Sequence, residues 1–312
     1  MEFTDIEKRV NVAITGSDGY IASVLYKELV AQKYNVICCD GSSDEDVIAH
    51  SFDDQQFIDR VVVNNCDTIF HLAANSEVGP SATNPLLYYH NNTSRTINMI
   101  NQLVRRGWKG RIVFSSTAAV YGDQNNIVTE DSPLQPCSHY GHSKLMCEQI
   151  LDVAHLYNID TTVFRYFNVA GAYDDVGQSV DQSHIVTRIC NAAAGREPLF
   201  IYGDDYPTVD GTCIRDYIHV RDVCLAQIFA MTNKINGTFN LGSLQGTTVK
   251  QLISEFVVHN QVPVNFLVGK RRKGDPAFLV ADPRKFMERG FTYQYSQIDT
   301  IVKSAWRYYN GL

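Results

Sequence analysis

Apolar runs and amphipathic stretches alternate along the first half of the chain. Each apolar run is short and nearly continuous, as expected of a parallel strand that is buried on both faces. The predicted strands are 10–15, 35–40, 47–52, 67–74 and 111–117, and the predicted helices are 20–32, 55–63 and 85–105. This alternation implies right-handed crossovers between strands. It predicts an α/β fold with a Rossmann doubly wound parallel sheet.

The second half begins with a helical pattern over 138–150 and a strand pattern over 161–171. From about Val169, polar loops rich in Gly and Asp interrupt shorter elements. The predicted elements there are strands at 200–202, 238–242 and 264–268, and helices at 220–232, 248–259 and a last one ending at Tyr309. We therefore expect a first domain over 1–168 and a smaller C-terminal α/β substrate domain over 169–312, with segments such as 216–242 packing back on the first. A ligand cleft would lie between them.

The first predicted strand is followed by the turn GSDGYIA. Gly16, Gly19 and Ala22 occupy its three small positions, which lets backbone amides at a helix start approach a pyrophosphate. The second strand ends in Asp40, whose carboxylate can accept hydrogen bonds from both ribose hydroxyls of NAD and would repel the 2′-phosphate of NADP. Because positions 41–51 contain no Arg or Lys to receive that phosphate, the sequence favours NAD as the cofactor.

Tyr140 and Lys144 lie four residues apart in a predicted helix and so share one face of it. An ammonium beside a phenol favours the phenolate, so we expect Lys144 to lower the pKa of Tyr140 and to make it a proton acceptor. Thr117, at the end of the preceding strand, can share a hydrogen bond with the same substrate oxygen. The spacing is weak evidence by itself and gains weight from the glycine turn before it.

Composition limits the class of protein and its partners. The 312 residues are 45% hydrophobic and 20% charged, as in an ordinary globular protein, and no run of 18 apolar residues or signal-peptide pattern occurs, so we expect a cytoplasmic protein without a membrane partner. The formal charge of −7 argues against nucleic acid and means that an anionic ligand needs local cations. The eight Cys lack CxxC spacing and predict buried thiols, with no metal site.

Several longer motifs occur in a fixed order along the chain. They are GSDGYIA, HLAA, FSSTAAVYG, YGHSK, RYFNVAGA, GDDYPTVDGTCIRDYIHVRDV, FNLG and RRKGD. Together they resemble the extended short-chain dehydrogenase/reductase superfamily, and within it the UDP-glucose 4-epimerases. The resemblance covers nearly the whole chain, and the block around DYPTVDGTCIRDYIHV is its most specific part.

This resemblance implies a role for each matching residue. Tyr140 matches the catalytic base, Lys144 its partner and Thr117 the residue that hydrogen-bonds the 4-hydroxyl of the sugar. The implied cofactor contacts are Gly16, Gly19, Tyr20, Ile21, Asp40, Phe52, Leu72, Ala73, Asn91, Ser115, Tyr140, Lys144 and Tyr166. The implied substrate contacts are Ser116, Thr117, Asn168, Tyr202, Arg215, Val249, Arg272, Asp275 and Leu279, with the two arginines at the diphosphate and Asp275 at a ribose hydroxyl.

The implied reaction is NAD-dependent epimerisation at C4 of a UDP-sugar through a 4-keto intermediate. A 4,6-dehydratase or decarboxylase is the enzymatic alternative, but dehydratases of this type carry Asp-Glu where Ala118 and Ala119 stand here. A non-catalytic NAD sensor is the other alternative, and the presence of all three catalytic residues argues against it. Leu279 is smaller than the Tyr of relatives restricted to plain hexoses, which predicts tolerance of N-acetylhexosamines.

Three positions depart from the pattern of the resembled enzymes. Ser51 replaces an Asp that contacts adenine, Ser76 replaces a Lys, and Ser138-His139 replaces the Asn-Pro before the catalytic Tyr. None removes a catalytic group, although the first two bear on cofactor retention. The resemblance also implies a homodimer, with the predicted helix over 85–105 as the candidate interface.

Overall fold

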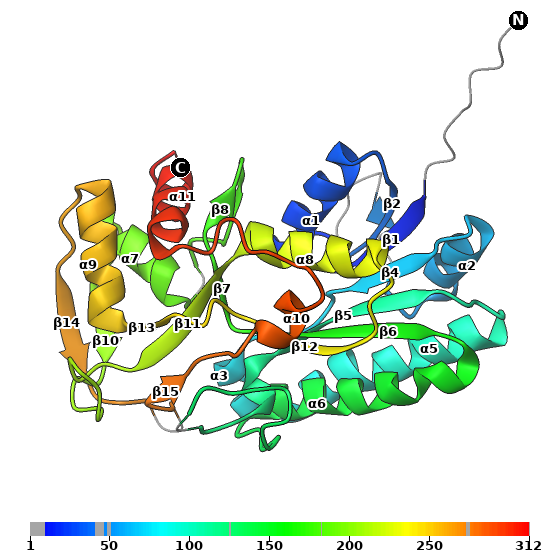
Figure 1. The fold of residues 1–312 in the computed structure, drawn as a ribbon, viewed down its shortest axis with the longest axis horizontal. Helices are drawn as coiled ribbons and strands as arrows, with labels where there is room; N and C mark the ends of the chain where they lie inside the picture. The colour runs from blue at the N-terminus through cyan, green and yellow to red at the C-terminus, as the bar shows by residue number, and fades with distance from the viewer. Residues whose placement is uncertain are drawn as a thin grey trace, which may run out of the picture.

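Seven parallel strands form the central sheet, in the order β12-β6-β5-β4-β1-β2-β3 (Figure 1). Their bounds are Asn11–Thr15 (β1), Asn35–Cys39 (β2), Val47–Ile48 (β3), Thr68–His71 (β4), Arg111–Thr117 (β5), Asp160–Tyr166 (β6) and Gly237–Leu241 (β12). The computed structural model describes residues 10–40, 51–124, 126–181, 183–272 and 275–311, and the backbone of 47–48, so part of the strand predicted over 47–52 lies outside the described residues. The predicted doubly wound parallel sheet is confirmed.

Helices cover both faces of the sheet (Figure 1). One layer consists of α1 (Tyr20–Ala31) and α8 (Val220–Thr232), and the other of α2 (Gln55–Val63), α5 (Arg95–Arg105) and α6 (His139–Asp152). Successive strand residues point to opposite faces, so Val12 and Ile14 enter the core under α1 and α8 whereas Ala13 enters the other core. Burial on both faces explains why the strands are nearly continuous apolar runs.

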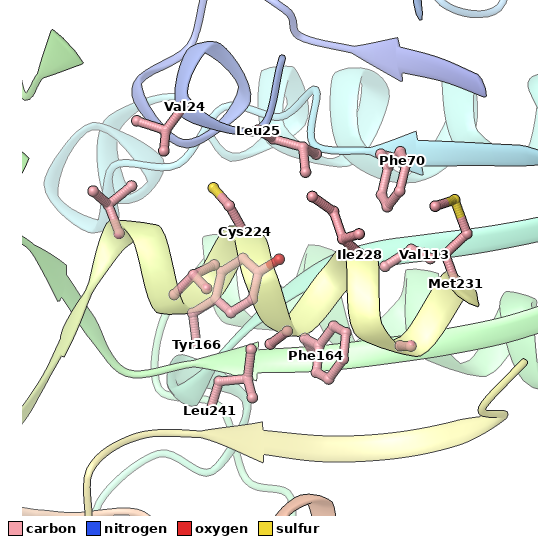
Figure 2. Close-up of a cluster of buried hydrophobic side chains, with 14 of the residues drawn as sticks. Val24, Leu25, Phe70, Val113, Phe164, Tyr166, Cys224, Ile228, Met231 and Leu241 are labelled. Carbon is pink, nitrogen blue, oxygen red and sulfur yellow. The ribbon is translucent and has the colours of Figure 1, made fainter. Parts of the chain in front are cut away.

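The core under α1 and α8 attaches a late segment of the chain to the first half. Val24 and Leu25 of α1 lie beside Cys224 and Ile228 of α8, above Phe164 of the sheet (Figure 2). Burying an aliphatic or aromatic side chain of this size contributes about 1.5–3 kcal/mol. These contacts, together with the pairing of β12 with β6, hold α8 and β12 on the sheet.

The strand predicted over 161–171 is two strands. β6 ends at Tyr166 in the central sheet, and β7 (Asn168–Ala170) pairs with β11 (Ile214–His219) in a separate sheet. The prediction of one strand was wrong because the apolar run continues unbroken through the point where the chain leaves the first sheet. Strand β11 was not predicted, although its DYIH segment is buried.

The helix predicted over 85–105 is interrupted. The structure has α4 (Pro85–Tyr88), a π-helical turn η1 (Tyr89–Ser94) and then α5. A π-turn carries one residue more per turn than an α-helix, and such turns often occur at functional sites. Hydrophobic periodicity does not distinguish it from a continuous helix, so the pattern of apolar residues did not predict it.

A second group of elements lies beyond the carboxyl end of β6. It comprises α7 (Ile185–Ala193), β10 (Leu199–Tyr202), β13 (Gly246–Thr248), α9 (Val249–Asn260), β14 (Phe266–Gly269), β15 (Phe278–Leu279) and α11 (Ile298–Asn310), together with β7 and β11. These helices share their own apolar core with β10 and β11. We did not predict helix α7 from the sequence, although its buried residues Val186, Ile189 and Cys190 have helical spacing. The domain boundary at residue 168 stays a prediction.

Two buried side chains are held by hydrogen bonds inside the core. His71 hydrogen-bonds Thr15 Oγ1 at 2.8 Å and Thr96 Oγ1 at 2.9 Å, and Trp108 donates to the Cys66 carbonyl at 2.8 Å. Among the described residues, no helix combines the length and the apolar character needed to cross a bilayer.

Candidate active site

A cavity of about 1350 Å³ opens at the carboxyl edge of the central sheet. The strand ends of β1, β2, β4, β5 and β6 all contribute to it, and the strand order reverses between β1 and β4 at this edge. Every predicted cofactor residue lines it: Gly16, Gly19, Tyr20, Ile21, Asp40, Phe52, Leu72, Ala73, Asn91, Ser115, Tyr140, Lys144 and Tyr166. The fold therefore brings together residues that are up to 150 positions apart.

The glycine turn closes one end of the cavity. Gly16 has φ +71°, and its amide donates to the Cys39 carbonyl at 2.8 Å, which fixes the turn against the end of β2. Asp40 follows that strand, and one carboxylate oxygen accepts from the Asp18 amide at 2.9 Å. The carboxylate predicted to hold a ribose is therefore attached to the turn predicted to hold the pyrophosphate.

The first backbone amides of α1 are available to bind an anion. Its N-cap is Gly19, which has no side chain to satisfy the first amides, and the first turn contains no acidic residue. The Ser17 hydroxyl beside it is buried and has no hydrogen-bond partner among the described residues. Open amides, a positive helix end and an unpartnered hydroxyl fit the pyrophosphate of a dinucleotide.

Thr117 and Tyr140 meet in the middle of the cavity. The Thr117 side chain accepts from the Ala119 amide at 3.1 Å, and it lies near enough to the Tyr140 phenol to lower the pKa of that phenol. Helix α6 begins next to this turn because the Ser138 hydroxyl caps it, accepting from the Gly141 amide at 3.1 Å. A Cβ on residue 141 would lie 2.6 Å from the Ala119 carbonyl, so only glycine permits the approach.

Lys144 lies deeper than the two hydroxyls. Its ammonium donates to the Ser115 carbonyl at 2.8 Å and sits 4.7 Å from the centre of the Phe114 ring. Burial lowers the pKa of Lys144 to about 8, against the opposing effect of Cys147 and Glu148, which raise it. At neutral pH the lysine is charged but easily discharged.

The structure corrects the expected effect on the pKa of Tyr140. Burial raises the pKa of Tyr140 to about 12, the Thr117 hydrogen bond opposes this rise, and Tyr88 adds to it. The sequence predicted the opposite direction because it placed the ammonium beside the phenol without their common burial. Desolvation disfavours the charged forms of both residues and is the largest effect on the pKa of each.

Two serines at the end of β5 have different partners. The Ser115 hydroxyl lies 3.0 Å from the Tyr166 hydroxyl, on the cavity side predicted for the cofactor. Ser116 also borders the cavity, but its hydroxyl donates to the buried Glu148 carboxylate. The predicted contact of Ser116 with substrate thus meets a competing partner.

The far end of the cavity carries the predicted nucleotide-sugar residues. Asn168, Arg215, Asp275 and Leu279 line it, and the Arg215 guanidinium donates to the Asp275 carboxylate at 2.5 Å. The three remaining residues, Tyr202, Val249 and Arg272, do not line it. Arg272 instead stacks over the Tyr202 ring at 4.0 Å, and Val249 is buried at the start of α9.

The sequence of residues 12–242 matches the NAD dependent epimerase/dehydratase family. The chain belongs to this family. A UDP-glucose 4-epimerase of Corynebacterium glutamicum is 34% identical to it over 97% of either chain. The predicted resemblance, NAD as the cofactor and the isomerase class are confirmed at this level.

Solved structures of epimerases have the same fold. A UDP-glucose-4-epimerase from Stenotrophomonas maltophila, with bound NAD and formylated UDP-arabinopyranose, matches with a TM-score of 0.91 and 31% identity, over 97% of this chain and 98% of that one. A UDP-Glc/GlcNAc 4-epimerase from Campylobacter jejuni matches with a TM-score of 0.82 and 35% identity, over 97% and 100%.

In this member of the epimerase/dehydratase family, the π-turn supplies Asn92, a residue behind the site that the sequence did not predict. Asn92 is buried there; its side chain accepts from the Asn75 amide at 2.8 Å and donates to Ser143 on α6 at 2.9 Å. Asn91, the predicted neighbour, donates to the Asn75 side chain at 3.3 Å. The turn therefore connects the loop after β4 to the helix of Tyr140. An Asn-Asn pair inside an apolar helical pattern was the available signal.

Proposed function

We propose that this protein inverts C4 of a UDP-sugar, interconverting UDP-glucose and UDP-galactose with NAD as cofactor. One observation carries the proposal: Thr117 and Tyr140 line the same cavity as the open glycine turn and the Arg215 and Asp275 pair. A dinucleotide at the turn and a nucleotide sugar at the arginine would meet at these two hydroxyls. The UDP-glucose 4-epimerases among its relatives support the same reading.

Tyr140 would take the proton of the 4-hydroxyl, while Thr117 holds that oxygen by a hydrogen bond. The bound 4-keto sugar would then turn within the cavity, and Tyr140 would return the proton to the C4 oxygen as C4 regains hydride on its opposite face. NAD, when bound, supplies the hydride acceptor and donor for C4 and a positive charge that favours the phenolate. Lys144 adds a second positive charge, and burial of the Tyr140 and Lys144 side chains would limit the access of water to the ketone.

The residues that would hold NAD are the glycine turn, Asp40 and Lys144. The turn offers amides and the start of α1 to the pyrophosphate, and Asp40 accepts from ribose hydroxyls. The partly buried Arg215 offers two planar N–H groups to a diphosphate. Its pairing with Asp275 keeps the guanidinium in place and leaves the carboxylate beside it for a ribose hydroxyl.

Elimination is disfavoured by the same turn. Ala118 and Ala119 border the cavity directly after Thr117, and neither side chain can act as an acid or a base. A 4,6-dehydratase needs both groups to remove water from the sugar. The intact Thr117, Tyr140 and Lys144 argue in turn against a sensor without catalysis.

We further propose that N-acetylhexosamines are accepted. Leu279 lines the cavity and is paired with Arg215 across β15 and β11. The adjacent Phe278 is not among the lining residues, as alternation along a strand requires, so it does not occupy this space. The similarity to the Campylobacter jejuni UDP-Glc/GlcNAc 4-epimerase is consistent with this choice.

The protein is proposed to form a homodimer through the layer of α5 and α6. Exposed apolar side chains occur on these helices and the segments next to them, at Leu86 (77% exposed), Ile97 (41%), Met146 (43%), Val153 (48%) and Leu156 (68%). An apolar surface of this kind typically marks a contact between subunits. A second copy would cover the same surface reciprocally around a two-fold axis.

The test is to incubate the protein and NAD⁺ with UDP-galactose, and separately with UDP-GalNAc, and to follow the C4 configuration by proton NMR. We expect inversion without net NADH. Y140F should lower the rate by about 10² to 10⁴, whereas Y88F, which alters the ring packed edge-on at 6.5 Å from Tyr140, should remain active. A 4-keto-6-deoxy product, or no change in either sugar, would contradict the proposal.

A further inference from the structure

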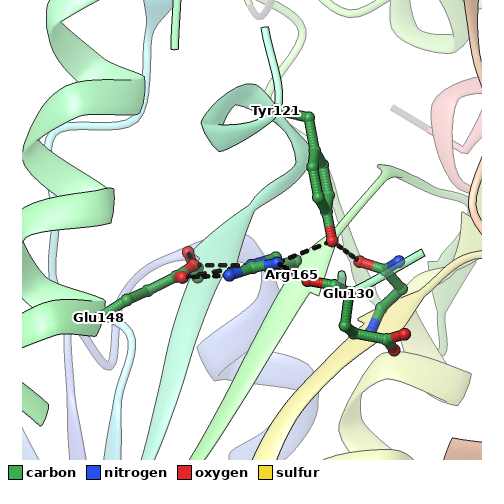
Figure 3. Close-up of polar contacts among 6 residues, drawn as sticks. Tyr121, Glu130, Glu148 and Arg165 are labelled. Atoms are coloured by element: carbon green, nitrogen blue, oxygen red, sulfur yellow. Dashed lines mark hydrogen bonds and ion pairs between the residues drawn. The ribbon is translucent and has the colours of Figure 1, made fainter. Parts of the chain in front are cut away.

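A buried ion pair lies behind the strand that ends in Thr117. Glu148 of α6 and Arg165 of β6 are joined by three hydrogen bonds, one from Nη2 at 2.7 Å and two from Nε at 3.1 and 3.2 Å, and their side chains are 7% and 6% exposed (Figure 3). Neither residue was singled out by the sequence. Burying two charges is costly, so such a pair is weak evidence for stability, and it is better suited to fixing one arrangement of the elements it joins.

The pair is connected to the catalytic strand through Ser116. The Ser116 hydroxyl donates to the Glu148 carboxylate, and Ser116 stands opposite Arg165 in the β5 and β6 register. Thr117 is the next residue along β5. The ion pair therefore holds the peptide that carries the Thr117 hydroxyl.

The same pair is attached to α6 one turn after Lys144. Glu148 follows Lys144 by four residues, so both lie on the buried face of the helix. On the outer side, Arg165 donates to the Tyr121 hydroxyl at 2.9 Å, and that hydroxyl donates to Asn240 of β12 at 2.6 Å (Figure 3). Helix α6 and strands β5, β6 and β12 are thus linked through this ion pair and the side chains that contact it.

We propose that Glu148 and Arg165 are positioning residues, which through Ser116 hold the Thr117 hydroxyl in register with Tyr140 and Lys144 on α6. This inference rests on the proposed function for its effect on turnover. It also reassigns Ser116 from substrate contact to support of the strand. A displacement of about 1 Å between reacting groups can lower a rate by roughly a hundredfold, so holding β5 against α6 has a measurable effect.

The carboxylate also acts on the charge of Lys144. The titratable groups that act on or respond to the ammonium are Cys147 and Glu148 on its own helix and His71 on β4. Glu148 is the carboxylate among them, and it opposes the effect of burial by raising the lysine pKa. Replacing it by glutamine keeps an oxygen for Ser116 but removes this charge.

The first arm of the test is S116A, which leaves the ion pair intact. If Ser116 supports the strand, kcat for UDP-galactose falls by at least roughly tenfold while KM stays within about twofold. If KM rises at unchanged kcat, Ser116 contacts the substrate and the inference is wrong. Unchanged kcat and KM would overturn it as well.

The second arm uses E148Q, and its measurement does not depend on catalytic turnover. NMR titration of ¹³C-labelled lysine, with the Lys144 signal assigned from K144R, should show the ammonium of E148Q discharging at lower pH than that of the parent. D160N is the matched control, because Asp160 pairs with Arg111 at 3.1 Å at the opposite ends of β5 and β6. It should leave kcat and the Lys144 titration unchanged.

An unchanged Lys144 titration in E148Q, or an equal shift in D160N, would overturn the inference. If E148Q does not fold, S116A alone decides the supporting role. A parent protein that leaves UDP-galactose unchanged would contradict the proposed function, and the titration would still test Glu148 by itself.

Discussion

A Cβ atom on Gly16 would lie 2.8 Å from both the Cα and the amide nitrogen of Ala73. The glycine turn after β1 and the loop after β4 are therefore in direct backbone contact at the point where the strand order reverses. No side chain can give way there, since the contact atoms belong to the main chain. The approach of the two loops forms the end of the cavity at which we expect the pyrophosphate.

G16A should accordingly lose both stability and NAD binding. The left-handed backbone alone costs an alanine about 1–2 kcal/mol, and the contact with Ala73 adds to this. G195A is a matched control, because Gly195 has φ +69° with nothing within 4 Å. Denaturant unfolding and calorimetric NAD titration should show the larger loss, and the loss of binding, only in G16A. Equal effects of the two substitutions would mean that the backbone conformation alone matters.

His71 should make stability depend on acid pH. Burial, and to a smaller extent Lys144, lowers the pKa of His71 to about 3. The unfolded chain binds a proton near pH 6.5 and the folded protein does not, so the free energy of unfolding contributed by this group falls as pH drops from about 6.5 to 3. The slope is about 1.4 kcal/mol per pH unit.

H71Q should remove that slope. Urea unfolding of the parent and H71Q at several pH values between 4 and 7 measures the difference in free energy, which should shrink toward acid pH. H155Q, at an exposed histidine, provides the comparison and should follow the parent at every pH. A constant difference between parent and H71Q would show that His71 has the same pKa in the folded and in the unfolded chain.

Leu279 should decide which sugar is accepted. L279Y fills space at the sugar end of the cavity, so the ratio of kcat/KM for UDP-GalNAc to that for UDP-galactose should fall by at least about tenfold. F278Y changes the neighbouring residue, which is not among those lining the cavity, and should leave the ratio unaltered. An equal decrease for both sugars in L279Y would place residue 279 away from the 2-substituent.

Met146 should belong to the dimer interface. A glutamate at this exposed position of α6 would place a charge in an apolar contact, so M146E should run as a monomer in light scattering after gel filtration. Val258 of α9 is 65% exposed and lies outside the layer of α5 and α6. V258E should therefore keep the mass of the parent, and a monomeric parent would contradict the proposed dimer.

Local patterns determined much of this protein. Buried parallel strands are recognisable as apolar runs, and the turn around Gly16, the acid Asp40 and the spacing of Tyr140 and Lys144 were readable because their signals lie within a few residues. All of them lie on the wall of one cavity, because parallel strands end at the same edge of the sheet.

Tertiary structure decided what depends on partners far along the chain. The pairing of Glu148 with Arg165 and Ser116, and the π-turn that aims Asn92 at α6, join residues 17 to 51 positions apart. The pKa of Tyr140 is raised because the whole fold buries the phenol. The spacing of a tyrosine and a lysine in the sequence carries no information about that burial. Periodicity reports which face of an element is buried; desolvation and hydrogen-bond partners are properties of the assembled core.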